Sequence, residues 1–451
     1  MSSTNMVDDA PLSGFHKKLA LYSSGGPFLD GYILSIIGVA MTQITPQLQL
    51  SESAQGLIGA SALIGIFLGA FAGGWLTDKF GRQVLYTVDL VAIIVCSVAQ
   101  FWATDPVWLF VLRLVIGMAV GADYPIATSL MAEFTPRKHR GVLLGGLLVM
   151  WFAGGSIAYI VGEAMLALGD DGWRWMLASA ALPATVIVLL RLGTPESPRW
   201  LVKKGRTAEA EKILKDVFGP EATLADLGEE ERENVDVKAI LRSGYGKRML
   251  FVSVFWTCSV VPLFAIYAFG PVILDALKLE GDLASYGAAV ISVLFTLGTI
   301  AALFAVNRMG RRTLLTHSFI WSGAALLLLG LFPDADASVV MALFSAYAVL
   351  IGGTQILQWI YPNELFPTEV RGTAVGLASS LSRIGAAVGT YLVPMALSGW
   401  GIGNTMLAAA AISAAGALAS LAWAPETRGL TLKESATLSD PAEPARQAVA
   451  G

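Results

Sequence analysis

The stretch GWLTDKFGRQ, from Gly74 to Gln83, has a counterpart in VNRMGRR, from Val306 to Arg312. Two other motifs recur at a similar offset of about 230 residues, which indicates an internal repeat. These further pairs are MAEFTPRKHRG at Met131 to Gly141 with PNELFPTEVRG at Pro362 to Gly372, and PESPRW at Pro195 to Trp200 with PETRG at Pro425 to Gly429. A constant offset across three motifs predicts two homologous halves.

The composition around these motifs is strongly apolar. Of the 451 residues, 55% are hydrophobic and 14% are charged, and the mean hydropathy is +0.65. A soluble protein needs a larger polar fraction to cover its surface, so we expect most of this chain to lie in a lipid bilayer. The net charge of -4 is spread along the chain, which leaves no basic patch for a nucleic acid.

About twelve apolar stretches are long enough to cross the bilayer, since a transmembrane helix needs roughly 20 residues to span ~30 Å of hydrocarbon. They begin near residues 19, 54, 84, 107, 141, 173, 248, 284, 313, 338, 372 and 402. The sequence therefore predicts an all-α integral membrane protein with about 12 transmembrane helices. The repeat predicts two six-helix bundles related by pseudo-two-fold symmetry, with a substrate site between the bundles near mid-membrane.

The spans and the polar stretches between them predict five segments. These are a cytoplasmic N-terminal tail at 1–18, an N-terminal six-helix bundle at 19–200, a cytoplasmic linker at 201–247, a C-terminal six-helix bundle at 248–430 and a cytoplasmic C-terminal tail at 431–451. The linker pattern EAEKILKDVF, from Glu209 to Phe218, predicts short amphipathic helices. The polar N-terminus lacks the apolar core and cleavage site of a signal peptide, so we expect the first span to be retained.

Charged residues in the loops predict the orientation in the membrane. Cations concentrate in alternate loops, which hold Lys79, Arg82, Arg137, Lys138, Arg140, Arg308, Arg311, Arg312, Arg371 and the stretch from Arg199 to Arg248. The other loops carry mainly acidic residues. Because cytoplasmic loops are enriched in Lys and Arg, we expect both termini to be cytoplasmic, in a plasma (inner) membrane.

Cysteine and histidine do not indicate a metal site. Cys96 and Cys258 both fall in apolar stretches, where a lone cysteine packs as a small apolar residue, and the three histidines are scattered. The spans contain no nucleophile–base set, which disfavours an enzyme and leaves no catalytic residue to name. We therefore expect neither a metal nor a cofactor.

Four motifs in the predicted loops and spans carry a family resemblance. They are GxxxDxxGR from Gly74 to Arg82, RxxxGxxxG from Arg113 to Gly121, PESPRWL from Pro195 to Leu201, and PETRG from Pro425. Together they resemble the sugar-porter-like and organic-ion-transporter-like branches of the major facilitator superfamily, and the likeness extends from about Gly25 to Thr431. The stretch GADYPIATSLMAEF, from Gly121 to Phe134, is most similar to metabolite and phosphate proton symporters. The resemblance implies alternating access powered by a proton gradient, and we expect a functional monomer.

Three features depart from the patterns of these families. Asn307 stands where the second-half motif usually has an aspartate, so that gate lacks one charge pair. The seventh span, 251–274, lacks the paired glutamines of hexose carriers, and the fifth span, 142–168, lacks the Gly-Pro signature of drug–proton antiporters. These departures disfavour a hexose carrier and an efflux antiporter.

Asp30 is a candidate proton carrier, because an ionisable residue inside a span is costly and usually functional. It lies about ten residues into the first span, or ~15 Å along the helix, which places it near mid-membrane. The resemblance pairs it with Arg113 in a salt bridge that protonation loosens. The alternative is a static ion pair that holds two helices together.

Asp123 matches the position where phosphate-type symporters carry a proton-linked or substrate-linked aspartate. It lies ten residues after Arg113, so the two side chains are roughly 80° apart around the helix and ~15 Å apart along it. They cannot pair directly, and Asp123 needs another partner or a proton. Gly117 and Gly121, between them, have the small-xxx-small spacing of close helix packing.

Arg383, in SSLSRIGAAVG, is a candidate for binding an anionic solute. The resemblance to organic-anion carriers places an arginine here to meet a carboxylate, and a planar guanidinium suits that ligand. The alternative is that Arg383 neutralises Asp123 or another buried acid.

Gln355, Gln358 and Trp359 fall within one turn of each other on a span that lines the cavity in these families. Amides beside an indole suit a polyhydroxylated or carboxylated solute. Trp151, Tyr267 and Tyr391 are further solute-binding candidates, for which helix packing or interfacial anchoring is the alternative.

A set of charged residues at predicted cytoplasmic helix ends is assigned to gating by the resemblance. This set is Asp78, Arg82, Glu133, Arg140, Arg199, Arg311, Glu364 and Arg371. Asp89 and Glu163 are expected near span ends and receive no role.

The leading functional hypothesis is proton-coupled symport (uptake) of a small polar metabolite, with an organic anion such as a sugar acid or another carboxylate as the candidate solute. The alternatives are a sugar or polyol transporter, an uncoupled facilitator and a non-transporting receptor. Retention of the gating motifs disfavours the receptor.

Overall fold

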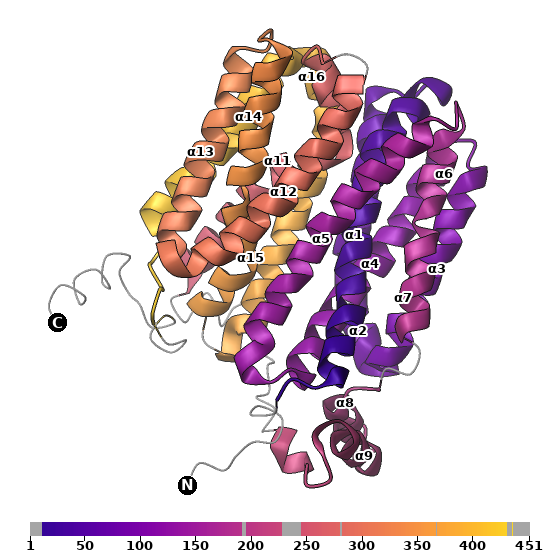
Figure 1. Ribbon diagram of the computed structural model, residues 1–451, viewed down its shortest axis with the longest axis vertical. Coiled ribbons are helices and arrows are strands. Elements are labelled where there is room, and N and C mark those ends of the chain that lie inside the picture. Colours follow the sequence, from indigo (N-terminus) through magenta and orange to yellow (C-terminus); the bar gives the residue numbers. More distant parts are fainter. Residues whose placement is uncertain are drawn as a thin grey trace, which may run out of the picture. The chain divides into compact units, whose positions relative to one another are not determined.

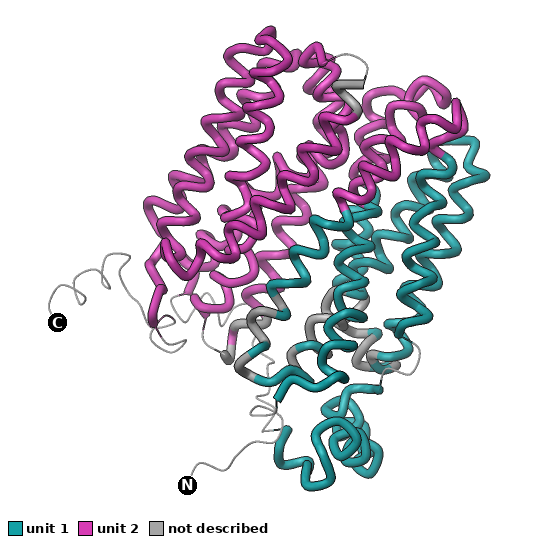
Figure 2. The backbone as a smooth tube through the Cα atoms, in the orientation of Figure 1, with its two compact units in different colours: residues 1–33, 61–154, 174–231 teal, residues 34–60, 155–173, 232–451 magenta. Residues whose placement is uncertain are grey.

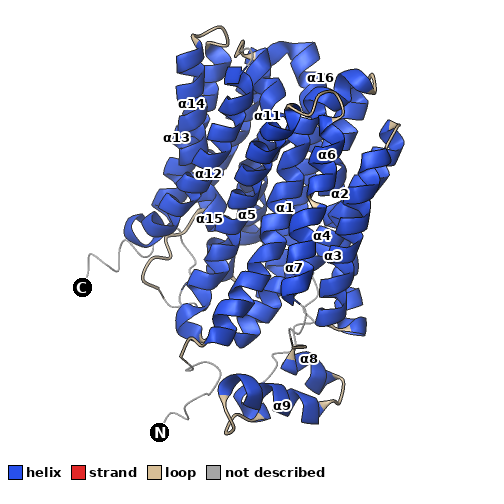
Figure 3. Ribbon diagram, turned by 45° about the vertical axis from the view of Figure 1, so that its right-hand side comes forward, coloured by secondary structure: helices blue, strands red, loops and turns tan. Residues whose placement is uncertain are grey.

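The secondary structure of this protein is helical throughout its described part. The computed structural model describes residues 11–191, 195–227, 245–279, 282–366, 368–430 and 435, and it contains no strand in those ranges (Figure 3). The all-α prediction is therefore confirmed.

The helices of the N-terminal half and of the following linker are labelled in Figure 1. They are α1 Gly14–Gln47, α2 Glu52–Phe80, α3 Arg82–Ala99, the short η1 Gln100–Trp102, α4 Pro106–Phe134, α5 Arg137–Leu166, α6 Gly172–Ser179, α7 Ala181–Arg191, α8 Pro198–Lys203, α9 Thr207–Phe218 and η2 Leu224–Leu227. The helices of the C-terminal half are α11 Gly246–Ala276, α12 Asp282–Met309, α13 Arg311–Leu331, α14 Ala337–Leu350, α15 Gly352–Leu365 and α16 Thr368–Trp423.

The described residues contain 11 helical stretches that are long and apolar enough to cross a membrane. The last of them, Thr373–Trp423, has 51 residues, which at 1.5 Å per residue is about twice the length that a bilayer needs. Its helix is interrupted at Gly401, whose φ of 76° and ψ of 168° are not helical. Because this glycine divides the stretch into two spans, the helices account for the twelve predicted spans.

The Cα positions group into two compact units (Figure 2). Unit 1 comprises residues 1–33, 61–154 and 174–231, and unit 2 comprises 34–60, 155–173 and 232–451. These units do not follow the predicted boundary between the halves near residue 200. Within unit 2, the end of α5 bonds to helices of the C-terminal half, since Tyr159 donates to the Tyr267 carbonyl at 2.9 Å and Ser156 donates to the Ser292 carbonyl at 2.9 Å. The division into two six-helix bundles stays a prediction from the repeat.

Glycines hold α2 and α4 together inside unit 1. A Cβ atom on Gly117 would lie 2.2 Å from the Ala62 carbonyl oxygen, and one on Gly121 would lie 2.3 Å from that of Ile66. Gly65 faces the Leu114 carbonyl at the same short range, 2.2 Å. The prediction of close packing from the small-xxx-small spacing is confirmed, because only glycine leaves room for this approach.

The linker segment after the sixth span forms α8, α9 and η2, which belong to unit 1. Ser197 caps α8 by accepting a hydrogen bond from the Trp200 amide at 3.2 Å. On α9, Ile213, Val217 and Phe218 pack against a cluster of Leu19, Leu85, Tyr86 and Phe134 from α1, α3 and α4. The apolar face of α9 therefore rests on the ends of the membrane helices of its own unit.

Candidate functional site

Asp30 lies in the interior of unit 1, on α1, with 2% of its surface exposed. The Trp151 indole on α5 donates a hydrogen bond from Nε1 to Asp30 Oδ2 at 2.7 Å. Three residues beyond Trp151, Gly154 lets α5 approach α1 closely, since a Cβ atom there would lie 1.9 Å from the Phe28 carbonyl oxygen. Trp151, which the sequence offered as a solute-binding residue, is therefore a partner of Asp30 in this structure.

Arg113 is also buried, but it does not bond to Asp30. Its Nη2 lies 3.5 Å from the Ile33 carbonyl oxygen on α1, nearly one turn beyond Asp30. Among the contacts described for Asp30 and Arg113, none is an ion pair between them. The predicted direct salt bridge is therefore not formed here, because the Asp30 carboxyl group turns towards α5 while the guanidinium reaches α1 further along.

Asp123 pairs with Arg191, at the end of α7. Arg191 Nη1 lies 2.7 Å from Asp123 Oδ1, and Nη2 lies 3.4 Å from Oδ2. Its guanidinium also stacks on the Tyr86 ring, 3.3 Å from the ring centroid. The interpretation that Arg383 neutralises Asp123 is therefore wrong, because Arg191 already takes that place.

Sequence reasoning missed Arg191. It ends the apolar run VIVLLRLG, and an arginine at a span end usually reaches water. Instead it is 4% exposed. Asp89 on α3, which the sequence placed near a span end without a role, is likewise 4% exposed, and its carboxyl group comes within side-chain hydrogen-bonding reach of Asp123. The only sequence signal for these contacts was that each residue is a charge beside a long apolar run.

Gly26 explains how α1 packs against this ion pair. A Cβ atom on Gly26 would lie 1.7 Å from Asp123 Oδ2 and 3.1 Å from Arg191 Nη2. Gly26 and Asp30 are four residues apart, so they share a face of α1 and are separated by about 6 Å along its axis. One face of α1 therefore contacts the Asp123–Arg191 pair at one level and presents Asp30 one turn further on.

The predicted amides come together in unit 2. Gln358 Nε2 donates to Ser259 Oγ at 2.6 Å and to Gln355 Oε1 at 2.9 Å. Both glutamines are buried, and Trp359, next to them on α15, packs edge-on against Trp256 of α11 at 5.6 Å between ring centroids. Three of the predicted solute-binding residues therefore form one group with the polar face of α11.

The other three predicted solute-binding residues of unit 2 lie apart from this amide group in their contacts. The Arg383 guanidinium carbon lies 5.3 Å from the Phe264 ring centroid, and no carboxylate of the described residues pairs with it. Tyr267 stacks on Phe295 at 5.2 Å. The Tyr391 hydroxyl lies 3.1 Å from Ser53 Oγ. Tyr267 and Tyr391 thus make packing and interhelical contacts, as the alternative interpretation holds.

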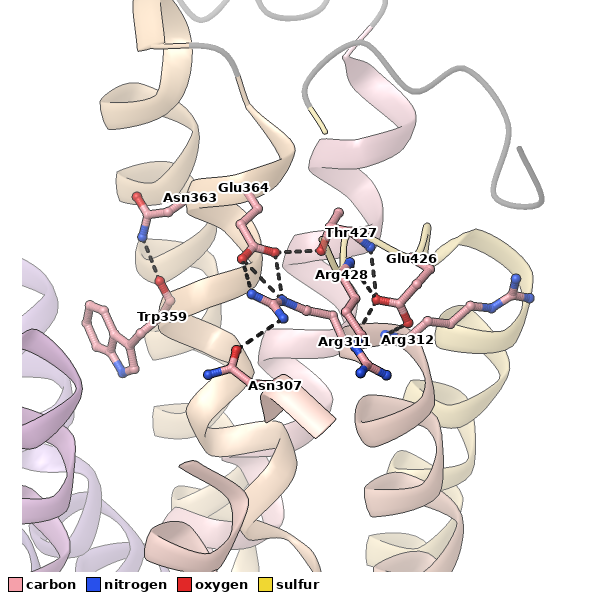
Figure 4. Close-up of polar contacts among 9 residues, drawn as sticks. All are labelled: Asn307, Arg311, Arg312, Trp359, Asn363, Glu364, Glu426, Thr427 and Arg428. Atoms are coloured by element: carbon pink, nitrogen blue, oxygen red, sulfur yellow. Dashed lines mark hydrogen bonds and ion pairs between the residues drawn. The ribbon is translucent and has the colours of Figure 1, made fainter. Parts of the chain in front are cut away.

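Two predicted gating residues form an ion pair at the end of the unit 2 helices (Figure 4). Arg311 Nη2 lies 2.7 Å from Glu364 Oε1, and Thr427 donates to Glu364 Oε2 at 2.5 Å. Asn307 Oδ1 accepts a longer hydrogen bond from Arg311, at 3.4 Å. Arg199, in unit 1, donates to the Leu227 carbonyl. The side chains of the other predicted gating residues lie outside the described residues: Asp78, Arg82, Glu133, Arg140 and Arg371.

A cavity of about 380 Å³ in unit 2 is distinct from the amide group. It is lined mainly by apolar residues, among them Val261, Pro262, Leu392 and Trp400. None of the residues predicted to bind the solute lines it. An apolar cavity does not suit a polar metabolite, so we do not assign the solute to it.

Comparison with known proteins places this arrangement in a family. Residues 19–438 match the family described as "Sugar (and other) transporter". The chain belongs to this family. The metabolite transport protein YaaU of Escherichia coli is 43% identical to this transporter over 97% of the chain and 98% of its own length. The inner membrane metabolite transport protein YgcS of Escherichia coli is 40% identical over 94% of the chain and 95% of its own length.

A solved structure shows which fold this transporter has. The proton:xylose symporter XylE of E. coli, bound to 6-bromo-6-deoxy-D-glucose, superposes with a TM-score of 0.77 at 23% identity, over 94% of this chain and 99% of XylE. The protein therefore has the fold of the major facilitator superfamily. Because the matching family and the two relatives are transporters, this protein is a transporter and not an enzyme.

Proposed function

We propose that this transporter is a proton-coupled symporter that takes up a small polar metabolite by alternating access. The observation that carries the proposal is the buried Asp30 carboxyl group and its 2.7 Å hydrogen bond from the Trp151 indole. An indole N–H donates to a carboxylate or to the carbonyl oxygen of a neutral acid, so Asp30 can gain and lose a proton without losing this contact. A carboxylate held by an arginine would instead resist protonation.

The named activity of a structural neighbour supports the same proposal. XylE is described as a proton:xylose symporter, and it shares the fold of this chain. Arg113, whose guanidinium reaches α1 nearly one turn beyond Asp30, is the cation that an ionised Asp30 would attract after a small rearrangement. Proton release and helix movement would then be linked through α1.

For the solute, we propose an organic anion such as a sugar acid or another carboxylate. Gln355 and Gln358 supply donors and acceptors for hydroxyl groups, and Arg383 supplies a guanidinium that no described carboxylate neutralises. The second candidate is a neutral sugar or polyol, which the amide group favours. The relatives' names support an inner-membrane location, and the loop charges support cytoplasmic termini. We propose a functional monomer that needs no cofactor other than the proton gradient.

The test uses proteoliposomes with and without an inward-directed proton gradient. Uptake of D-xylose, D-xylonate, D-glucose and D-gluconate is measured for the wild type and for Asp30→Asn, which mimics a permanently protonated acid. We expect gradient-driven accumulation in the wild type only, while Asp30→Asn retains exchange of solute across the membrane. Full accumulation by Asp30→Asn would contradict the coupling role of Asp30 and favour an uncoupled facilitator.

A further inference from the structure

Unit 1 contains a second group of buried ionisable residues, apart from Asp30. It consists of Asp89 on α3, Asp123 on α4 and Arg191 on α7, and each has 4% of its surface exposed. Three helices thus bring two acids and one base to a single point. The proton transfer proposed for Asp30 does not need this group, so its presence asks for a separate explanation.

The contacts of Arg191 account for its whole guanidinium. It binds both oxygens of Asp123, donates from Nη1 to the Tyr86 carbonyl at 3.2 Å, and lies with Nε 3.4 Å from the Tyr22 carbonyl oxygen. The Tyr86 ring covers one face of the guanidinium. Arg191 therefore neutralises one carboxylate, and that carboxylate is Asp123.

Asp89 is left with a different set of neighbours. Its Oδ1 accepts a hydrogen bond from the Leu90 amide at 2.7 Å, and its carboxyl group faces Asp123 within side-chain hydrogen-bonding reach. The charged groups that face it are Asp123 from α4 and Arg191 from α7, and the neighbouring Tyr86 on its own helix is neutral. Where α1 packs on the pair it presents Gly26, which brings no charge.

Counting charges in this group gives an excess of one acid. With both carboxyl groups ionised, two negative charges would lie in contact, away from water, with one positive charge between three helices. Burial and like-charge repulsion both disfavour that state, and a single proton held between the two carboxyl groups removes the excess. This is how two adjacent buried carboxyl groups share one proton.

We propose that Asp89 and Asp123 form a second proton-binding site of this transporter, with Arg191 as its fixed counterion. In this structure Asp89 is the neutral acid that donates to the Asp123 carboxylate. On deprotonation the O–H bond of Asp89 breaks, the proton passes to water, and the two carboxylates compete for Arg191. Because Gly26 of α1 covers the pair one turn from Asp30, a change of charge here acts on the helix that carries the first proton site.

The significance of this site for transport rests on the proposed function, but its existence can be tested without solute or gradient. The purified full-length protein is titrated from acid to alkaline pH, and the carbonyl stretch of protonated carboxyl groups is recorded by infrared difference spectroscopy. The background is Asp30→Asn, so that Asp30 does not contribute. We expect the Asp30→Asn protein to keep a protonated-carboxyl signal that the Asp30→Asn/Asp89→Asn protein loses.

Asp123→Asn in the same background sharpens the test. With Asp123 neutral, Asp89 becomes the counterion of Arg191 and ionises, so the signal should again be lost although Asp89 is unchanged. Asp334→Asn is the control, because Asp334 pairs with Lys278 on the surface with 75% of its side chain exposed, and it should leave the signal intact. A signal that survives Asp89→Asn overturns the proposal.

The folding of the variants also decides between the interpretations. Asparagine has the size and neutrality of the protonated acid, so Asp89→Asn should keep the thermal stability of the parent at neutral pH, while Asp89→Asn/Asp123→Asn should lose stability because Arg191 then lacks an anion. Failure of Asp89→Asn alone to fold would mean that Asp89 is needed as a charge, and it would overturn the proposal. If the infrared signal behaves as expected but uptake shows no proton coupling, only the proposed function fails.

Discussion

The interiors of the two compact units differ in the kind of polarity they bury. In the described part of the chain, every buried Asp, Glu, Lys or Arg side chain belongs to unit 1: Asp30, Asp89, Arg113, Asp123 and Arg191. The buried polar side chains of unit 2 are hydroxyls and amides, such as Ser259, Gln355 and Gln358. Groups that change charge and groups that form neutral hydrogen bonds are thus kept apart, which supports proton binding in unit 1 and solute binding in unit 2.

The ends of the helices are, in contrast, built alike in the two halves. Glu196 of the first PES motif accepts a hydrogen bond from the Gln83 amide at 3.1 Å, and Glu426 of the PET motif accepts from the Arg311 amide at 2.9 Å. Each glutamate therefore caps the start of α3 or α13, directly after a glycine with positive φ, Gly81 or Gly310. The repeat in the sequence preserves this capping device, whereas the interiors have diverged.

The largest effect on this comparison should come from Arg191→Met. Removing one member of a buried ion pair leaves the other charge without compensation, at a cost of about 3–5 kcal/mol. We expect Arg191→Met to lower the thermal stability of the detergent-solubilised protein severely. Asp123→Asn should restore much of the loss in the Arg191→Met background.

The matched control for that prediction is Arg206→Met. Arg206 pairs with Glu209 at 2.6 Å, but the two side chains are 50% and 55% exposed. An exposed pair contributes little, so the melting temperature should scarcely change. If Arg191→Met were as mild as Arg206→Met, the charged interior of unit 1 would not be a structural requirement.

Arg383→Lys tests whether unit 2 receives a charge from its solute. If a carboxylate binds the planar guanidinium, a point charge in its place should weaken binding of a sugar acid about tenfold, or ~1.4 kcal/mol. Binding of the corresponding neutral sugar should be unaffected. Affinities of the wild type and the variant for one sugar and its acid, measured by isothermal titration, decide the matter. Equal wild-type affinity for both would defeat the anion hypothesis and favour the sugar or polyol alternative.

Glu196→Gln and Glu426→Gln test the likeness of the helix ends. Each removes the negative charge that the helix N-terminus favours, and the expected loss of stability is about 1 kcal/mol for either variant. The two losses should be similar because the two caps have the same geometry. Thermal unfolding of the two variants side by side measures this, and a loss confined to one of them would show that the caps are not equivalent.

Asn307→Asp should have the smallest effect. An aspartate at 307 would replace the 3.4 Å amide contact with Arg311 by an ion pair, which at this exposed position contributes ~0.5 kcal/mol. We expect a small shift towards the outward-open state, seen as slower labelling of a cysteine introduced at Asn363, beside Glu364 (Figure 4). Asn307→Ser, which adds no charge, serves as the control. Equal labelling of the Asp and Ser variants would refute a role for this position in gating.

Local patterns in the amino-acid sequence were sufficient to predict the helical fold, the positions of the spans and several residues of the site. Hydropathy is a local property, so a run of apolar residues defines a span wherever its neighbours lie. The same logic singled out Asp30, Arg113 and Asp123, because a charge within such a run is unfavourable without a function or a partner. The small-xxx-small spacing of Gly117 and Gly121 likewise predicted close packing, because four residues in a helix place both glycines on one face.

The partners of the buried groups, in contrast, depend on the tertiary structure. Trp151 and Asp30 are 121 residues apart in the chain, and Arg191 and Asp123 are 68 apart. The sequence sets the order of polar residues along a helix, but the groups that each one meets depend on how neighbouring helices pack around it. For that reason Asp30 was expected against Arg113 and lies against Trp151, and Asp89, which was expected near a span end, is buried with Arg191 beside Asp123.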